Sequence, residues 1–217
     1  DGVTNTCYNA LDLHIDNGLG DKIALIYDSP ITGAKSNHTY SQLREKVSKF
    51  AWALRNQEIG KGDRVIIYMP MIPEAVIAML ACSRIGAIHS VVFGGFASNE
   101  LANRIEDSKA KILITASCGF EPGRTIEYKP LVDKAIEISK HKLNKTILYQ
   151  RSGHEVKLNG KNEISWDEAL NGATETDCVE MNSNELAYIL YTSGTTGTPK
   201  GIVRDIGGHI VALKWTM

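Results

Sequence analysis

The chain has 217 residues, of which 43% are hydrophobic, enough apolar sequence to build a sizeable core and to exclude a disordered chain. The formal net charge is −1 at pH 7, no basic patch accompanies an amphipathic helix, and no apolar stretch could span a bilayer. We therefore expect neither a nucleic-acid partner nor a membrane partner. The four cysteines show neither metal-ligand spacing nor a disulfide framework, which is typical of a reducing compartment: Cys7, Cys82, Cys118 and Cys178.

Strand and helix patterns alternate along the first half of the chain. Residues 22–28 predict a strand. Thr39, followed three residues later by Gln42, predicts a capping box at the start of a helix. A buried strand over 64–68 precedes a helix that begins at Pro73 and ends before a glycine. The first helix carries apolar residues on one face: Leu43, Val47, Phe50 and Leu54.

The alternation continues in the second half. Ser98 is the expected N-cap of one helix, Pro130 the expected start of another, and a short helix is expected near Trp166 within a polar stretch over 151–172. The strands are expected over residues 87–93, 110–117, 145–150, 185–191 and 201–205.

Strands rich in Ile and Val, separated by helices, indicate an α/β fold with a mostly parallel sheet and helices on both faces. In such sheets, ligands bind beyond the carboxyl ends of the strands. The loops that follow Phe93, Ser117 and Tyr191 are therefore the candidate binding loops. Neither an internal repeat nor a proline-rich or charged linker divides the chain.

The loop after Tyr191 carries the strongest signal, because it combines glycines, the hydroxyl side chains of Thr192, Ser193, Thr195 and Thr196, and Lys200. Glycines let the backbone approach an anion, successive N–H groups form an anion-binding concavity, and lysine adds a compact positive charge. This composition suits a polyphosphate. The loop is not a Walker A motif, because Pro199 and the apolar residues after it predict a second strand instead of a helix. The alternative is a hydrophilic hairpin turn.

Weaker signals come from the other two loops. Gly94 and Gly95 would permit close approach of a ligand, and the flanking phenylalanines could stack on a base, although an ordinary strand-to-helix turn is equally consistent. Taken alone, Arg124 and Lys129 are interpreted as solvated loop residues. The six histidines are dispersed without a ligand pair, so no metal site is expected, and Cys82 is interpreted as a packing residue.

The stretch YTSGTTGTPKG resembles, residue for residue, the phosphate-loop signature of the adenylate-forming superfamily, which contains acyl-CoA synthetases, firefly luciferase and adenylation domains. Residues 68–117 are similar to short-chain acyl-CoA synthetases. The stretches EPGRTIEYKPLVDKAI and KGIVRDIGGHIVALKW most resemble the propionate-CoA ligase branch. Acetate enzymes usually carry His-Thr where this chain has Arg204 and Asp205, and often a second arginine where it has Glu121.

The resemblance implies a two-step reaction. A short-chain carboxylate attacks the α-phosphate of ATP, with Mg²⁺ on the phosphates, to give acyl-AMP and pyrophosphate, and CoA then releases AMP. By resemblance, the ATP phosphates would be held by Thr192, Ser193, Gly194, Thr195, Thr196, Gly197 and Lys200. The nucleotide end of CoA would be held by Phe93, Gly94, Gly95, Glu121, Pro122, Gly123 and Arg124.

The resemblance also predicts the domain organisation. Residues 1–217 correspond to the N-terminal portion of the large AMP-binding domain, without the rest of that domain or the small lid domain. No catalytic residue is therefore expected within them, and we expect the 217 residues alone to be inactive. The leading prediction is a propionate-CoA ligase of the mitochondrial matrix or cytoplasm. Acetate-CoA ligase and a non-catalytic nucleotide-binding or interaction fragment are the alternatives.

Overall fold

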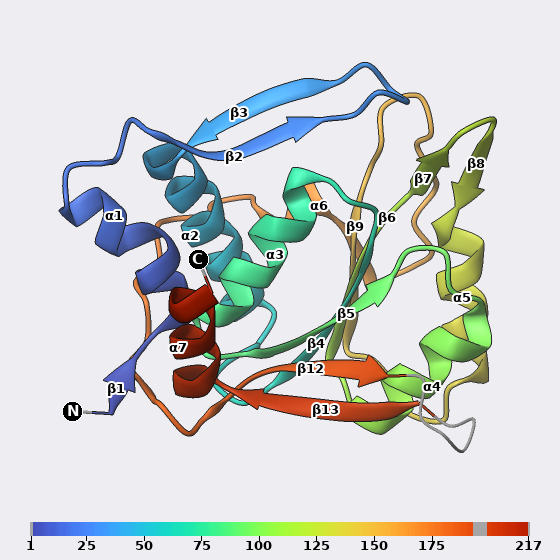
Figure 1. Ribbon diagram of the computed structural model, residues 1–217. Coiled ribbons are helices and arrows are strands. Elements are labelled where there is room, and N and C mark those ends of the chain that lie inside the picture. Colours follow the sequence, from blue (N-terminus) through green and yellow to red (C-terminus); the bar gives the residue numbers. More distant parts are fainter. Residues whose placement is uncertain (1, 193–198, 217) are drawn as a thin grey trace.

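A seven-stranded sheet forms the centre of the molecule. The computed structural model describes residues 2–192 and 199–216 (Figure 1). The sheet consists of β4 (Arg64–Met69), β5 (Ile88–Phe93), β6 (Ile112–Ala116), β9 (Lys145–Tyr149), β10 (Glu163–Ser165), β12 (Leu186–Thr192) and β13 (Lys200–Asp205). Their order is β10-β9-β6-β4-β5-β12-β13, and every neighbouring pair is parallel except β12 and β13. The predicted mostly parallel sheet is confirmed.

Helices cover both faces of this sheet, as predicted. One face packs against α2 (Tyr40–Asn56) and α3 (Pro73–Arg84), and the other against α4 (Ser98–Ser108) and α5 (Tyr128–Ile138) (Figure 1). Successive side chains of a strand point to opposite faces. Val65 and Ile67 accordingly lie in the core beside α2 and α3, whereas Ile66 and Tyr68 lie in the core beside α4 and α5. Burial on both faces explains why the strand shows no polar alternation.

The predicted capping box begins α2. The backbone N–H of Gln42 donates to Thr39 Oγ1 at 3.2 Å, and the N–H of Thr39 donates to Gln42 Oε1 at 3.0 Å. Two N–H groups at the helix start are thereby satisfied. The apolar face predicted for this helix is buried in the core: Leu43, Val47, Phe50 and Leu54.

Two helix starts differ from the sequence predictions. Ser98 is the first residue of α4 instead of its N-cap, and Ala97, which precedes it, offers no side-chain acceptor. Helix α5 begins at Tyr128, two residues before Pro130. Proline is tolerated there because N–H groups in the first turn have no partner within the helix. Both corrections arise because proline and serine fit several positions of a first turn.

Smaller elements surround the sheet. Strand β2 (Ile23–Asp28), predicted from sequence, pairs with β3 (Lys35–Thr39), which the sequence analysis missed. Two further antiparallel pairs join β1 (Val3–Thr4) to β11 (Met181–Asn182) and β7 (Cys118–Glu121) to β8 (Arg124–Glu127). The remaining helices are the π-helical turn η1 (Tyr8–Asp12), α1 (Leu13–Asp16), α6 (Trp166–Ala169) and α7 (Ile206–Thr216). Helix α6 confirms the short helix expected near Trp166.

None of the helices in the described part of the chain has both the length and the apolar composition needed to cross a bilayer.

Candidate functional site

The candidate binding loops start from one edge of the sheet. Tyr188 of β12 lies opposite His89 of β5, and Met69 of β4 lies opposite Phe93. Thr192 and Phe93 each follow their paired residue by four positions, so these adjacent parallel strands end at the same level. The loop after β5 and the loop after β12 therefore begin side by side, at the edge where parallel sheets bind ligands.

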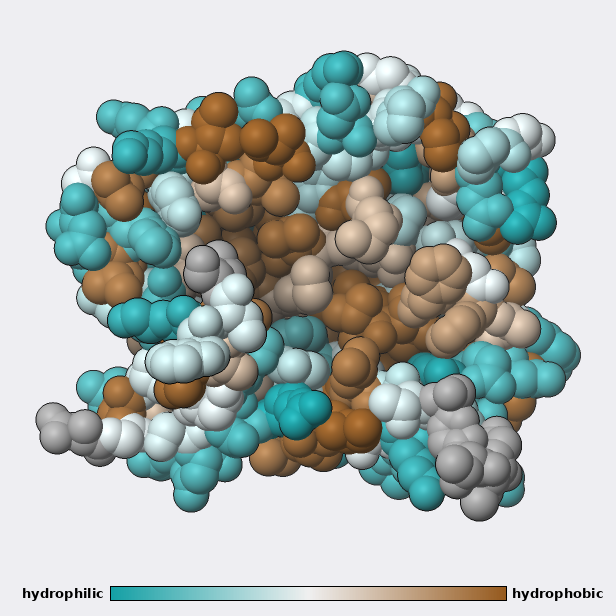
Figure 2. Space-filling model, viewed as in Figure 1, coloured by the Kyte–Doolittle hydropathy of each residue, from teal (hydrophilic) through white to brown (hydrophobic). Residues whose placement is uncertain are grey.

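A cavity of about 510 Å³ lies at this edge, between the end of β5, the turn after β4 and the β7–β8 hairpin. Figure 2 shows hydrophobic residues gathered around the hollow in the middle of this face. Phe93, Gly94 and Glu121 all line the cavity, so residues from two separate predicted CoA segments meet there. The other predicted CoA residues are not part of the lining: Gly95, Pro122, Gly123 and Arg124.

A second hollow of about 790 Å³ adjoins the cavity. It shares Phe120 and Arg151 with the cavity and extends toward β3 and the start of α3. None of the sequence-predicted site residues that the structure describes lines it. The second hollow is the larger of the two. The 510 Å³ cavity is nevertheless the better candidate site, because predicted site residues line it and it lies at the ends of β4 and β5.

The EPGR stretch, residues 121–124, forms the turn of the hairpin between β7 and β8. Glu121 and Arg124 are paired across a turn whose two central residues are Pro122 and Gly123. Gly123 has a φ of +76°, a conformation that favours glycine after a proline in a two-residue turn. Arg124 Nε donates to Glu121 Oε2 at 2.7 Å, and the arginine side chain is 69% exposed. An ion pair this exposed is weak, so Arg124 can exchange it for an anionic ligand.

Gly94 and Gly119 lie against the same aromatic side chain. A Cβ added at Gly94 would lie 2.1 Å from the hydroxyl oxygen of Tyr128, and one added at Gly119 would lie 2.6 Å from it. Tyr128 is buried and also packs against Tyr68, with ring centroids 4.9 Å apart. Gly94 is therefore required by the packing of Tyr128, whatever ligand approaches it.

Helix α4 connects the two binding loops through Arg104. Its guanidinium carbon lies 4.8 Å from the ring centroid of Phe96 and 5.3 Å from that of Tyr191, distances at which cations attract aromatic faces. Tyr191 also donates its hydroxyl to Asp107 Oδ2 at 2.6 Å. The sequence analysis assigned Asp107 no role. A sequence signal for Arg104 exists: it follows Leu101 by three residues and so lies on the apolar face of the helix. An arginine buried on such a face needs partners for its charge.

The predicted phosphate loop joins β12 and β13. Thr192 and Lys200 are exposed and face each other in the antiparallel pair at the base of this hairpin. The second strand that the sequence predicts after the loop is therefore present, since β13 begins at Lys200, where a Walker A motif would begin a helix. Five of the predicted phosphate-binding residues lie outside the described residues: Ser193, Gly194, Thr195, Thr196 and Gly197.

Lys129 is not the solvated loop residue that the sequence suggested. It lies in the first turn of α5, its side chain is 6% exposed, and its ammonium pairs with Asp133 and with Glu163 at 2.9 Å. Burial opposes its charge, but the hydrogen bonds to both carboxylates outweigh burial and raise the pKa of Lys129. This lysine therefore links α5 to β10 through an ion pair with Glu163, and it does not line the candidate site.

His89 is a half-buried histidine of the sheet whose Nδ1 atom is buried. His89 of β5 stacks on Tyr188, with ring centroids 5.7 Å apart, and its Nδ1 has no hydrogen-bond partner among the described residues. Burial, with a smaller contribution from His209, lowers the pKa of His89 to about 4. The ring is therefore neutral at pH 7 and acts as a packing residue of the sheet.

Comparison with known proteins agrees with the geometry. The family described as "AMP-binding enzyme" matches residues 14–216. The chain is 54% identical over 218 aligned residues to human "Acyl-CoA synthetase short-chain family member 3, mitochondrial", covering all of this chain and 32% of that protein. It is 44% identical to "Acetyl-coenzyme A synthetase" of Streptomyces coelicolor, again over the whole chain and 33% of that protein.

The fold matches as well. The structure of "Acetoacetyl-CoA Synthetase from Streptomyces lividans" aligns with a TM-score of 0.85 and 26% identity, over 97% of this chain and 31% of that one. The chain thus spans about a third of the length of the curated relatives it matches. These relatives confirm the resemblance to short-chain acyl-CoA synthetases, whereas the resemblance to the propionate branch stays a prediction. Since the family match covers nearly its whole length, the chain belongs to the AMP-binding enzyme family.

Proposed function

We propose that this chain contributes the ATP-phosphate and CoA sides of an AMP-forming short-chain acyl-CoA synthetase. The protein would join a short-chain carboxylate to CoA and convert ATP to AMP and pyrophosphate. Mg²⁺ would enter with ATP, as part of that substrate. The relatives named as mitochondrial favour the mitochondrial matrix over the cytoplasm as its compartment.

The proposal rests chiefly on the observation that the adjacent parallel strands β5 and β12 end at the same level of the sheet. The first half-reaction leaves acyl-AMP at the ATP site, and the CoA thiol must then reach its acyl carbonyl, so the ATP site and the CoA site must adjoin. The loop carrying Thr192 and Lys200 and the cavity lined by Phe93, Gly94 and Glu121 start from neighbouring strands. Holding both substrates in reacting geometry is the main contribution that a protein makes to such transfers.

For the acyl group, we propose propionate, with acetate as the alternative. The resemblance to the propionate branch includes Arg204 and Asp205. In this structure, Asp205 Oδ1 accepts a hydrogen bond at 2.6 Å from the backbone N–H of Gly208 at the start of α7, while Arg204 is exposed on β13. Neither residue lines the 510 Å³ cavity. The preference for propionate therefore rests on resemblance and is tested by comparing kcat/KM for the two acids.

The test uses pyrophosphate exchange into ATP, which isolates the first half-reaction, alongside thioester formation with the full set of substrates. We expect carboxylate-dependent exchange by the protein in its complete natural length. Lys200→Ala should slow the exchange roughly 10- to 1,000-fold, the scale of losing one charge-stabilising donor. Stability should be unchanged, because Lys200 is exposed.

Lys142→Ala is the matched control. Lys142 is also exposed, but it precedes β9 and therefore lies near the opposite edge of the sheet. Its removal should leave both half-reactions unchanged. Nucleotide binding without any carboxylate-dependent exchange would reject the enzyme and support the alternative of a non-catalytic nucleotide-binding module. An unchanged exchange rate in Lys200→Ala at low and at saturating ATP would reject the phosphate role of the loop.

A further inference from the structure

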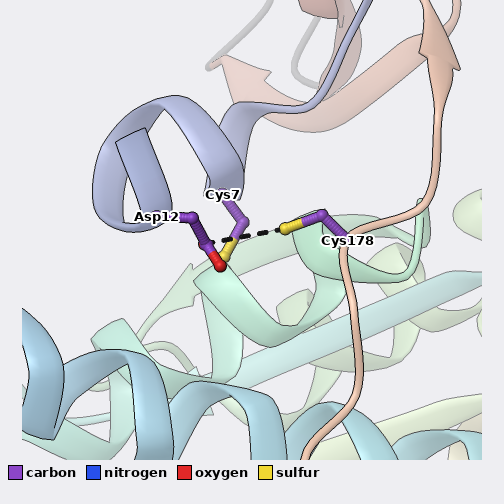
Figure 3. A group of neighbouring side chains, drawn as sticks. All are labelled: Cys7, Asp12 and Cys178. Carbon is purple, nitrogen blue, oxygen red and sulfur yellow. Dashed lines mark hydrogen bonds between the residues drawn. The ribbon is translucent and has the colours of Figure 1, made fainter. Parts of the chain in front are cut away.

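Two cysteines that are far apart in the sequence meet on the side of the molecule away from the candidate substrate site. Cys7 directly precedes η1, Asp12 ends η1, and Cys178 belongs to the extended segment before β11 (Figure 3). Each of the three residues has one sulfur or carboxylate oxygen that could bind a metal ion, and these three atoms all lie within 4.8 Å of one another. Cys178 Sγ donates to Asp12 Oδ2 at 3.7 Å. The cysteines are scattered in the sequence, and no spacing among them predicts this cluster.

A buried arginine decides what the cluster can bind. The Arg84 side chain is 2% exposed; its Nη1 and Nη2 donate to the two oxygens of Asp12 at 2.8 and 2.9 Å, and Nη1 also donates to Cys7 Sγ at 3.4 Å. A divalent cation placed among these groups would meet a guanidinium that already bonds two of the three ligands, and like charges at such distances repel. The same guanidinium stabilises a negatively charged sulfur.

The two sulfurs differ in character. The hydrogen bond from Cys178 is the largest influence on Cys7, and together with the charge of Arg84 it outweighs burial and lowers the pKa of Cys7. The pKa of Cys178 is raised, first by its side-chain interaction with Cys7 and then by burial. Cys7 therefore gives up its proton more readily than Cys178, which suits it to attack a neighbouring oxidised sulfur.

The backbone around both cysteines is held by a single buried side chain. Asn5 Oδ1 accepts from the backbone N–H of Cys7 at 2.8 Å, and Asn5 Nδ2 donates to the carbonyl of Val179 at 2.9 Å. Residues adjacent to each cysteine are therefore fixed relative to one another. Cys178 is half-buried and lines a surface pocket of about 560 Å³, whereas Cys7 is fully buried behind it. Small solutes can therefore reach the pair from the Cys178 side.

We propose that Cys7 and Cys178 form an oxidant-sensitive thiol pair that peroxide converts into an intramolecular disulfide. Peroxide first reaches Cys178: as its sulfur attacks, the S–H proton passes to Asp12 Oδ2, the O–O bond breaks, and the departing hydroxide takes up a proton and leaves as one water, so that Cys178 becomes a sulfenic acid. The Cys7 thiolate then attacks the Cys178 sulfur, and hydroxide leaves and takes up a proton as the second water. The two sulfurs lose two electrons in total, and peroxide gains them. In a reducing compartment, such a bond would be transient and reversible by thiols.

The test begins with the reduced protein, which is exposed to hydrogen peroxide in a time course. At each time point the remaining thiols are alkylated under denaturing conditions, and the protein is digested without reductant for mass spectrometry. We expect a cross-linked peptide that joins Cys7 to Cys178 and is two hydrogens lighter than the sum of its parts. Cys82 and Cys118, both buried, serve as controls within the same molecule. The pair should oxidise at least about 10-fold faster than either control, because Cys178 lines a surface pocket and has Asp12 and Cys7 beside it, whereas the two controls are buried.

Two variants separate the steps. In Cys7→Ser, the Cys178 sulfenic acid should accumulate and react with dimedone, because no second sulfur resolves it. In Cys178→Ser, Cys7 should stay reduced at the same peroxide dose, because its sulfur is buried. Serine is close in size to cysteine and keeps an acceptor for Arg84, so circular dichroism should show both variants folded.

Three results would overturn the proposal. One is retention of all four thiols at a peroxide dose that oxidises the urea-unfolded chain, and another is oxidation of Cys82 and Cys118 as fast as the pair. The third is protection of both Cys7 and Cys178 from alkylation by one equivalent of Zn²⁺ in the native protein, which would assign the cluster to a metal.

Discussion

Replacing Gly94 by alanine should destabilise the protein through Tyr128. The added Cβ would lie 2.1 Å from the Tyr128 hydroxyl oxygen, 2.8 Å from its Cζ and 3.1 Å from the carbonyl oxygen of Met69. Tyr128 is buried in the core beside α4 and α5, so its ring cannot swing into solvent. Overpacking of this kind costs about 1–3 kcal/mol, and the closeness of these contacts favours the upper part of that range. The melting temperature should fall by ~5–10 °C.

A double-mutant cycle identifies the cause. Tyr128→Phe removes the oxygen at 2.1 Å but leaves the ring carbon at 2.8 Å, so the double variant should recover about half of the loss, with a coupling energy of ~1 kcal/mol. Gly95→Ala is the matched control. Its Cβ would meet only the ring of Phe93, at 3.1 Å, and that side chain is 68% exposed and free to move.

Urea unfolding followed by circular dichroism, with all variants at one protein concentration, measures these differences. We expect the order wild type, Gly95→Ala, double variant, Gly94→Ala, from most to least stable. If Gly94→Ala were as stable as the wild type and instead raised the KM for CoA, the glycine would serve ligand approach and our packing argument would be wrong.

The remaining predictions concern charge. Asp12→Ala should cost about 3–5 kcal/mol in urea unfolding because it leaves the buried Arg84 without its carboxylate, whereas Asp28→Ala, which breaks an exposed ion pair, should cost under about 1 kcal/mol. Arg124→Ala should raise the KM for CoA and leave pyrophosphate exchange and stability unchanged; an equal fall in exchange would place Arg124 in the ATP site. Because burial lowers the pKa of His89 to about 4, the unfolded chain binds more protons between that pH and about 6.5. Stability should therefore fall as pH falls through this window, and His89→Asn should reduce that slope in a pH series of urea titrations.

The strands of the central sheet and the helix layers on its two faces were largely predictable from local patterns in the sequence. Apolar residues at helical spacing predicted the buried face of α2, and continuous Ile/Val-rich runs predicted strands buried on both faces. The capping box of Thr39 and Gln42 was predictable because both its hydrogen bonds join residues three positions apart. The strand after the phosphate loop was predictable for a similar reason: Pro199 and the apolar residues after it are local signals.

The candidate site was only partly predictable. The loops after β5, β6 and β12 were named because the carboxyl ends of parallel strands share an edge. The roles within them came from resemblance, and the structure adds physical reasons that no local pattern contains. Gly94 is needed because Tyr128, 34 positions later, fills the space beside it (94 to 128). Pro122 and Gly123 form a hairpin turn that presents Arg124.

The tertiary structure alone decided which distant side chains meet. Cys7 and Cys178 are 171 positions apart (7 to 178), and Arg84, which organises them, comes from a third segment. Tyr191 and Asp107 are 84 positions apart, and Lys129 gains its partner Glu163 only when α5 packs beside β10. Periodicity reports which face of an element is buried, since burial repeats with the geometry of that element. It carries no information about what lies opposite, because the partner of a buried charge or thiol is set by how whole elements pack.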